Sequence, residues 1–154
     1  MEEKAIFAMG CFWHAENIFC KIPGVVKTTV GYTGGKIINP TYKQVCSGET
    51  GHAEAIKIIF DPDKISYEKL LDIFWKSHNP TSLNRQGFDV GTNYRSAIFY
   101  TSEKQKKEAI KSRNFLQRKL IYKIVTEINP EAEFYRAEEC HQRYAEKHGG
   151  KCTI

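Results

Sequence analysis

The sequence predicts an α+β protein. Short strand-like segments and amphipathic helix-like segments follow one another in mixed order along the chain. The 154 residues contain no internal repeat, no low-complexity tract and no linker that would divide two domains. This length is sufficient to bury a hydrophobic core without disulfide staples. We therefore expect a single domain over residues 1–154, with a flexible C-terminal tail from about residue 149.

The first half of the chain predicts three strands and one helix. The apolar run at residues 5–8 predicts a strand, and a helix is expected to begin near Cys11. The β-branched residues of 25–32 predict a second strand. Residues 54–60 alternate with a period of two, as a half-buried strand does, until Asp61-Pro62 ends the pattern.

The second half predicts a long loop between helices and strands. Ser66 begins an imperfect capping sequence, and the helix that follows has its apolar residues on one side until His78-Asn79-Pro80 stops it. Residues 79–94 show little periodicity, and loops of that length are usually functional. The other expected elements are a strand over 96–100, a basic helix over 102–120, a strand over 124–128 and a last helix over 136–148.

Composition limits the cell compartment and the partners. The net charge of +5 is concentrated in the expected helix 102–120, whose one apolar face and single aromatic, Phe115, indicate a solvated surface rather than a nucleic-acid site. Apolar runs are too short to cross a bilayer, and no secretory signal is visible. Five cysteines without C-x-x-C spacing suit a reducing compartment. We expect a soluble, cytoplasmic protein that binds neither nucleic acid nor membrane.

Cys11 is the first candidate functional residue. It stands between Gly10 and two large aromatics, Phe12 and Trp13, directly behind the first expected strand. A helix beginning here would place the sulfur on the first turn, where free backbone N–H groups favour an anion, so we expect the thiolate to form more readily. Free cysteine is also often a buried packing residue. The adjacent glycine favours the functional interpretation.

Glu54 is the second candidate. If Ile56 and Ile58 face the core, the period of two turns Glu54 inward as well. A carboxylate on an apolar face either forms a salt bridge or has a raised pKa suited to general acid catalysis, and the sequence leaves both possibilities open. The glycines of residues 31–36 do not form a phosphate-binding loop, because Ile37 stands where that motif needs Ser or Thr.

Six motifs are spread over nearly the whole chain. They are residues 10–16 (GCFWHAE), residues 31–35 (GYTGG), Tyr42, residues 46–54 (CSGETGHAE), residues 91–96 (GTNYRS) and residues 137–142 (AEECHQ). In their order and spacing they resemble the A-type methionine sulfoxide reductases, the peptide-methionine (S)-S-oxide reductases. Two positions depart from the usual pattern of that family, since His14 replaces a smaller residue and Cys140 lies at a variable position.

The resemblance carries expectations for fold and activity. It implies a two-layer α/β sandwich, a mixed sheet with flanking helices around a ferredoxin-like plait core, with long coil segments. It implies reduction of methionine-S-sulfoxide, free or within proteins, with electrons ultimately from thioredoxin. It implies neither a metal nor an organic cofactor.

Sulfoxide reduction also sets chemical requirements that can be compared with these residues directly. A sulfoxide sulfur is electrophilic only when its oxygen is protonated or strongly hydrogen-bonded, so a reductase needs a thiolate at sulfur and a donor at oxygen. Cys11 and Glu54 fit these two roles. The resemblance implies that the phenols of Tyr42 and Tyr94 donate to the same oxygen. It also implies that Asp89 helps to orient the donors and a water.

The remaining expectations concern the methyl group and the second thiol. Phe12 and Trp13 are placed to hold the S-methyl group through sulfur–aromatic contacts. Attack would leave a sulfenic acid on Cys11, with which another thiol must condense to form a disulfide. Cys152 is the first candidate for that resolving thiol, because Gly149-Gly150 precede it, as in the Gly-rich tail of the family. Cys140 is the reserve candidate; Cys20 is expected to be a packing residue, and Cys46 matches a family position without assigned chemistry.

Three other functions remain open. A thiol peroxidase or cysteine hydrolase would also use an activated cysteine, although a hydrolase needs an oriented histidine base, and neither His14 nor His52 has an obvious third group. A zinc-binding module could use the Cys and His residues near the C-terminus, but their spacing is not that of structural zinc. A nucleic-acid binder would depend on the basic helix. The potential zinc ligands are Cys140, His141, His148 and Cys152.

Overall fold

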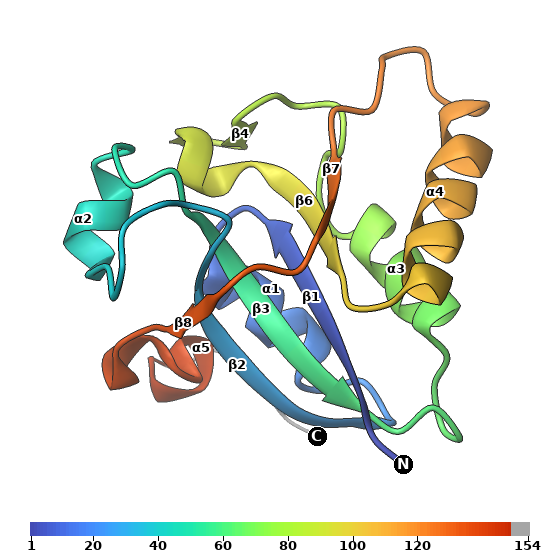
Figure 1. Cartoon of the computed structure of the whole chain (residues 1–154), viewed down its shortest axis with the longest axis horizontal. Helices are drawn as coiled ribbons and strands as arrows, with labels where there is room; N and C mark the ends of the chain where they lie inside the picture. Colours follow the sequence, from blue (N-terminus) through green and yellow to red (C-terminus); the bar gives the residue numbers. More distant parts are fainter. Residues whose placement is uncertain (149–154) are drawn as a thin grey trace.

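The computed structural model describes residues 1–148, and its centre is a six-stranded sheet (Figure 1). The expected tail and Cys152 lie outside these residues. The strand order is β7-β6-β1-β3-β2-β8; β6 and β7 are parallel and all other neighbours are antiparallel. The strands are β1 (Glu3–Met9), β2 (Val25–Thr33), β3 (Ala53–Phe60), β6 (Ser96–Tyr100), β7 (Glu127–Pro130) and β8 (Phe134–Arg136).

The sheet is curled, as the connection between its two edge strands requires. β7 and β8 lie at opposite edges, yet only three residues separate Pro130 from Phe134. Four residue steps span about 14 Å at most, whereas the edges of a flat six-stranded sheet are about 24 Å apart. Curling brings the edges together, and the connecting segment passes in front of the sheet in Figure 1.

Helices cover one face of the sheet. The main core joins Phe7, Ile56 and Ile58 of the strands to side chains of α1 (Phe12–Phe19) and α3 (Tyr67–Lys76), with Ala109 of α4 (Glu103–Gln117) at one side. The opposite face presents small residues such as Ala8, Ala55 and Ala97, against which Phe134 packs. The predicted α+β sandwich with a mixed sheet and flanking helices is confirmed.

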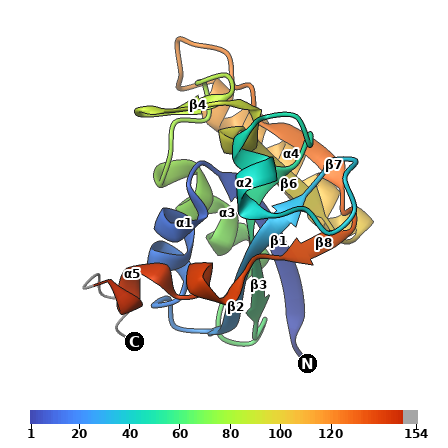
Figure 2. The same ribbon diagram turned by 90° about the vertical axis from the view of Figure 1, so that its left-hand side faces the viewer.

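The shorter elements lie around the sheet. They are α2 (Tyr42–Cys46), β4 (Arg85–Gln86), β5 (Asp89–Val90), η1 (Thr92–Tyr94), η2 (Glu139–His141) and α5 (Tyr144–Lys147). In Figure 2, β4 lies at the top, α2 in the middle and α5 at the lower left. β4 and β5 form a small hairpin inside the segment that we predicted to be a plain loop. α2 was not predicted; it has only five residues and begins with a capping box between Thr41 and Gln44.

The last third of the chain departs most from the predictions. The strand expected at 124–128 begins instead at Glu127, because the side chain of Gln117 binds the backbone N–H of Ile124 and holds that segment to the end of α4. The helix expected over 136–148 is wrong. Residues 134–136 are the edge strand β8, and Arg143 adopts a left-handed conformation (φ 54°) that interrupts any helix.

Long-range hydrogen bonds replace that helix. The side-chain amide of Gln142 accepts the N–H of Val30 at 3.0 Å and donates to its carbonyl at 2.9 Å. The N–H of Ala137 donates to the same carbonyl. The carboxylate of Glu138 accepts the phenol of Tyr32 at 2.8 Å. These residues are therefore tied to β2, and the amide of Gln142 also donates to the carbonyl of Ala137 at 2.9 Å.

Candidate active site

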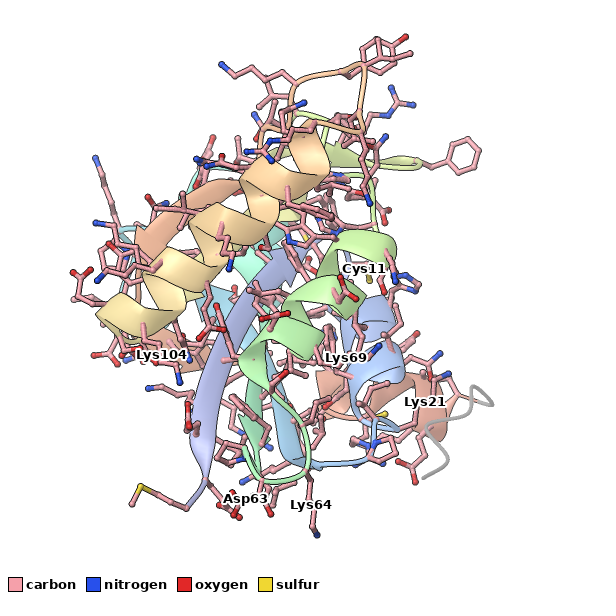
Figure 3. The ribbon with its side chains drawn as sticks, turned by 90° about the vertical axis from the view of Figure 1, so that its right-hand side faces the viewer. Cys11, Lys21, Asp63, Lys64, Lys69 and Lys104 are labelled. Atoms are coloured by element: carbon pink, nitrogen blue, oxygen red, sulfur yellow. The ribbon has the colours of Figure 1, made fainter. Side chains whose placement is uncertain are left out.

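Cys11 lies in the tight turn between β1 and α1. It occupies the N-cap of α1, and its carbonyl accepts the N–H groups of His14 and Ala15. Gly10 has a φ of +98°, and a Cβ at this position would lie 2.9 Å from the side chain of Gln86, so only glycine fits here without strain. Figure 3 shows the half-buried Cys11 at one end of α1, with Lys21 at the other end of that helix.

The charge state of Cys11 differs from the expectation. Burial, together with the negative charge of Glu54, raises the pKa of the thiol to about 11. The backbone N–H groups of Trp13 and His14 lower the pKa, as the position at the helix N-terminus predicts, but they do not outweigh burial. The prediction of an easily formed thiolate is therefore wrong for the unliganded site, in which the thiol keeps its proton.

Glu54 faces the core beside this turn. It is 1% exposed, on the same face of β3 as Ile56 and Ile58, as the period of two predicts. Its carboxyl accepts the N–H of Phe12 at 3.2 Å and the side-chain amide of Asn93 at 3.5 Å. Within residues 1–148 it forms no ion pair.

The two hydrogen bonds of Glu54 do not offset the effect of burial on its pKa. The pKa of Glu54 is raised to about 7: burial is the main cause and the charge of Asp89 adds to it, whereas the two hydrogen bonds act in the opposite direction. The two possibilities left open by the sequence are thereby resolved in favour of a raised pKa. A carboxyl with a pKa near neutrality can hold or release a proton at physiological pH.

Tyr42 and Tyr94 lie on two separate elements near this carboxyl. Tyr42 is the first residue of α2, and its backbone N–H donates to Glu138 at 2.9 Å. Tyr94 ends the short helix η1. Burial raises the pKa of both phenols, that of Tyr94 to about 12, and the charge of Glu54 acts on each of them. Both therefore remain protonated donors at neutral pH.

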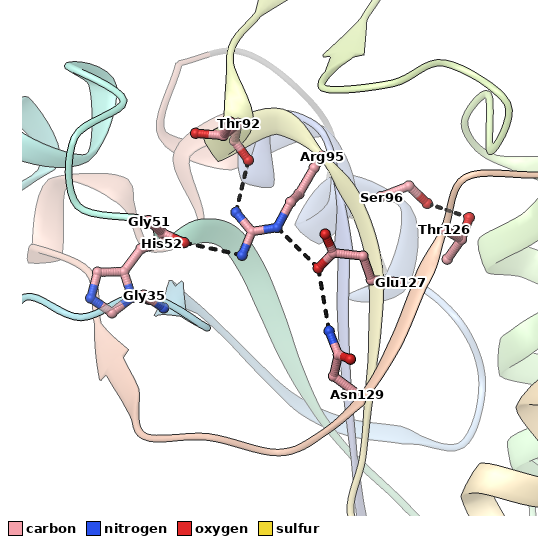
Figure 4. A network of polar contacts seen from close by, with 9 residues as sticks. All are labelled: Gly35, Gly51, His52, Thr92, Arg95, Ser96, Thr126, Glu127 and Asn129. Carbon is pink, nitrogen blue, oxygen red and sulfur yellow. Dashed lines mark hydrogen bonds and ion pairs between the residues drawn. The ribbon is translucent and has the colours of Figure 1, made fainter.

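Arg95 connects the short helix η1, which carries Tyr94, to the segment just before β3, the strand that carries Glu54 (Figure 4). Its guanidinium donates to the carbonyl of Thr92 in η1 at 2.9 Å and to the carbonyl of Gly51, just before β3, at 3.1 Å. It also forms an ion pair with Glu127 at 3.2 Å. One side chain thus joins three segments that are distant in the sequence.

Aromatic side chains form a cluster beside Cys11. Phe12 is fully buried, with its ring centroid 6.2 Å from that of Tyr42 and 5.6 Å from that of His141. Trp13 is half-buried, and its indole N–H donates to Nδ1 of His141 at 3.1 Å. Its ring stacks on Tyr144 with a centroid distance of 3.7 Å. Phe12 therefore belongs to the interior of the cluster, whereas Trp13 reaches its surface.

Three residues join the candidate site only in the structure. Asn93 donates to Glu54, His141 accepts the indole of Trp13, and Tyr144 covers its ring. His141 was considered only as a zinc ligand, although its position within motif 137–142 was a signal of importance. Asn93 likewise lies within motif 91–96, whereas no local pattern marks Tyr144.

Asp89 lies at the exposed edge of the site. It is part of β5 and lines a cavity of about 240 Å³ together with Cys11 and His14. His78 lines the same cavity; it binds the carbonyl of Phe74 at 2.7 Å and the hydroxyl of Ser96 at 2.7 Å. Burial lowers the pKa of His78 to about 4, so this imidazole is neutral in the physiological range.

The other candidate thiols and histidines are placed as follows. Cys46 and Cys140 are free and exposed, whereas Cys20 is buried and disulfide-bonded, so the expectation that it serves only in packing is wrong. Both ring nitrogens of His52 are engaged by backbone groups, those of Gly35 at 3.0 Å and Ile37 at 2.7 Å. In the part of the chain that the structure describes, no three His, Cys, Asp or Glu side chains are grouped so that they could hold a metal ion. No helix of that part is long and apolar enough to span a bilayer.

The fold and the site together define a class of α+β proteins in which a thiol at a helix N-terminus lies beside a buried, protonatable carboxyl and a cluster of aromatic rings. Residues 3–154 match the model of the peptide methionine sulfoxide reductase family. The chain therefore belongs to the peptide methionine sulfoxide reductases. The resemblance inferred from the six sequence motifs is confirmed.

Individual relatives agree with this assignment. The peptide methionine sulfoxide reductase MsrA of Methanosarcina acetivorans is 56% identical over 149 residues, which cover 96% of this chain and 79% of that protein. The reduced form of Mxr1 from Saccharomyces cerevisiae is 37% identical, with a TM-score of 0.92 and coverage of 97% of this chain and 87% of that one. Mxr1 in complex with Trx2 is matched with a TM-score of 0.68 and 29% identity, over 93% of this chain and 84% of that one.

Proposed function

We propose that this protein reduces methionine-S-sulfoxide to methionine, with Cys11 as the attacking thiol and thioredoxin as the reductant. One observation carries the proposal: Glu54, a buried carboxyl with a pKa of about 7, binds the N–H of Phe12, the residue directly after Cys11. This geometry supports a nucleophile and a proton donor in the same pocket.

The proton balance of the pair suits both roles. Because the pKa of Cys11 is about 11 and that of Glu54 about 7, the pair holds one proton between these values, and the proton resides on sulfur. Transfer of that proton to Glu54 produces a thiolate and a carboxylic acid. The carboxylic acid can then protonate the sulfoxide oxygen while the thiolate attacks the sulfur.

Tyr42, Tyr94 and Asp89 complete the oxygen-binding side of the proposal. The two phenols remain neutral beside Glu54 and can donate to the sulfoxide oxygen without contributing charge. Asp89 faces the cavity of Cys11, and its charge helps to keep the pKa of Glu54 high. Its proposed role is therefore to favour the protonated form of the acid and to orient a water at the cavity mouth.

The aromatic cluster would receive the S-methyl group. Trp13 offers a half-buried ring that is fixed by its bond to His141 and by stacking on Tyr144. Phe12, which is fully buried, supports that ring cluster from behind through Tyr42 and His141. Contact between sulfur-bound methyl groups and aromatic rings favours this arrangement.

The reaction balances with two thiols. Oxygen passes from the sulfoxide to the sulfur of Cys11, which gives methionine and a sulfenic acid; a second thiol then condenses with the sulfenic acid and releases water. We propose Cys152 as that thiol, with the exposed Cys140 in reserve. Thioredoxin would reduce the resulting disulfide, and the relative Mxr1 has been captured with Trx2. The odd number of cysteines favours a reducing cytoplasm as the place of this cycle.

Separated sulfoxide epimers test the proposal. We expect the purified protein to reduce the S epimer of methionine sulfoxide with dithiothreitol and to leave the R epimer unchanged. Cys11→Ser should abolish turnover, because the hydroxyl is a far weaker nucleophile. Turnover that persists in Cys11→Ser, or equal rates with hydrogen peroxide as substrate, would contradict it.

A further inference from the structure

Two loops at one end of the molecule expose several large apolar side chains. Ten large hydrophobic residues are exposed within residues 1–148, and five of them lie in segment 79–94 or in the loop that follows α4. Figure 2 shows both loops at the same end of the molecule. We call these five residues the apolar rim: Leu83 (70% exposed), Phe88 (100%), Val90 (68%), Ile121 (96%) and Tyr122 (75%).

The rim adjoins the opening to Cys11. Gln86, Gly87 and Asp89 line the same cavity of about 240 Å³ as Cys11, and Phe88 stands between the last two of these residues at the tip of the β4–β5 hairpin. Gln86 also packs directly against the turn at Gly10. A chain segment that brings a side chain to the thiol therefore passes close to Phe88.

The hairpin that carries Phe88 is held in place by several hydrogen bonds. The side-chain amide of Gln86 binds both the N–H and the carbonyl of Asn79, at 3.0 and 2.7 Å. The N–H of Gly91 donates to Asn84 at 2.9 Å. The two loops of the rim are joined by a bond of 2.8 Å from the N–H of Val125 to the carbonyl of Pro80. The backbone that carries Phe88 is therefore held in place, so a partner that covers the exposed ring does not have to order the loop first.

We propose that the apolar rim binds the residues that flank a methionine sulfoxide within an extended segment of an oxidised protein. The enzyme would then prefer protein-bound sulfoxide with apolar neighbours over free methionine sulfoxide. An extended chain rises about 3.3 Å per residue, so side chains two or three positions from the sulfoxide reach about 7–10 Å from it, the range of a neighbouring hairpin. This inference rests on the proposed function.

One observation favours the substrate over thioredoxin as the occupant. The cavity of Cys11 shares Ser77 and His78 with a second surface cavity of about 500 Å³, which is lined in part by Leu116 and Leu120. A groove that continues away from the thiol suits an extended chain better than the compact surface of a folded domain.

The test compares three substrates with dithiothreitol as reductant: free methionine-S-sulfoxide, a peptide in which Leu and Phe flank the sulfoxide, and the same peptide with Gly and Ser flanks. The variant is Phe88→Ala. Its control is Val26→Ala, which truncates another exposed side chain; the adjacent Val25 pairs with Phe60, as Glu3 does, so Val26 lies at the end of the sheet opposite Cys11.

We expect the wild-type chain to favour the apolar peptide. Phe88→Ala should lower kcat/KM for that peptide about tenfold, equivalent to 1.4 kcal/mol, and change the other two substrates by less than about twofold. Val26→Ala should change none. The inference is overturned if Phe88→Ala leaves the apolar peptide unchanged, if it slows all three substrates equally, or if the loss appears only when thioredoxin replaces dithiothreitol. A wild-type chain inactive on every sulfoxide would instead overturn the proposed function, and this inference with it.

Discussion

Two buried glutamates on neighbouring elements are held in contrasting ways. Glu16 of α1 is 2% exposed and Glu54 of β3 is 1% exposed. The carboxylate of Glu16 accepts the hydroxyl of Thr28 and the N–H of Arg143, both at 2.6 Å. That of Glu54 accepts two longer bonds, of 3.2 and 3.5 Å. Equal burial is therefore accompanied by two short bonds at Glu16, which tie α1 to distant segments, and by two longer bonds at Glu54, where burial raises the pKa.

The largest predicted effect separates the two glutamates by catalysis. Glu54→Gln keeps the shape of the side chain but removes its transferable proton, so kcat/KM for methionine sulfoxide should fall by roughly 10²–10⁴-fold. Glu16→Gln should remain within about threefold of the wild type, since it lies outside the proposed chemistry. Steady-state kinetics at pH 7.5 measure both. Equal losses in the two variants would remove the distinction.

The pH profile of the rate sharpens the role of Glu54. The active form of the pair carries one proton, so wild-type kcat/KM should rise through about pH 7, as the doubly protonated pair loses a proton, and then stay level towards pH 11. In Glu54→Gln the limb near pH 7 should disappear, and the residual rate should rise with ionisation of the thiol alone. A limb that persists near pH 7 in this variant would assign it to another group.

In stability, the loss is expected at Glu16 rather than at Glu54. Glu16→Gln replaces one acceptor oxygen by an NH₂ group, which leaves either the hydroxyl of Thr28 or the N–H of Arg143 without its acceptor. We expect a loss of about 1–3 kcal/mol in the free energy of unfolding. Urea denaturation at pH 7 measures it. An unchanged midpoint would show that these short bonds contribute little.

The last prediction is a gain in stability at Glu54. Its pKa is raised from 4.5 to about 7 in the folded protein, so folding favours the protonated carboxyl; the stability this group provides is present below about pH 4.5 and is lost as pH rises through about 7. Glu54→Gln imitates the protonated form and should therefore be more stable than the wild type at pH 8, by up to about 3 kcal/mol. The difference should vanish at pH 4. Denaturation at both values tests the sign.

The sequence predicted those parts of the site that have a local signal. Cys11 was recognised from its immediate neighbours, and the inward direction of Glu54 follows from the alternation of β3. The raised pKa of the thiol could not be predicted, because it depends on burial and on the charge of Glu54, which is 43 positions away in the chain. Local features of the helix terminus indicated the opposite direction.

The errors in the fold have a similar origin. Residues 136–148 have a helix-like composition, yet bonds of Ala137 and Gln142 to Val30 hold them along β2. His141 and Tyr144 reach Trp13 only because of that arrangement. Tertiary contacts between segments more than 100 residues apart outweigh local propensity here. These contacts are what single-sequence patterns do not contain.

The paired bonds between Gln142 and Val30 have a consequence beyond the site. β8 covers β2 at residues 31–33, and the side-chain amide of Gln142 then occupies the N–H and carbonyl of the next residue inward. The side chain of Gln142 thus continues the hydrogen bonding of β8 along β2, and the N–H and carbonyl of Val30 are not free to pair with a second molecule. Loss of that amide would uncover backbone groups at this edge of the sheet and favour self-association of the protein.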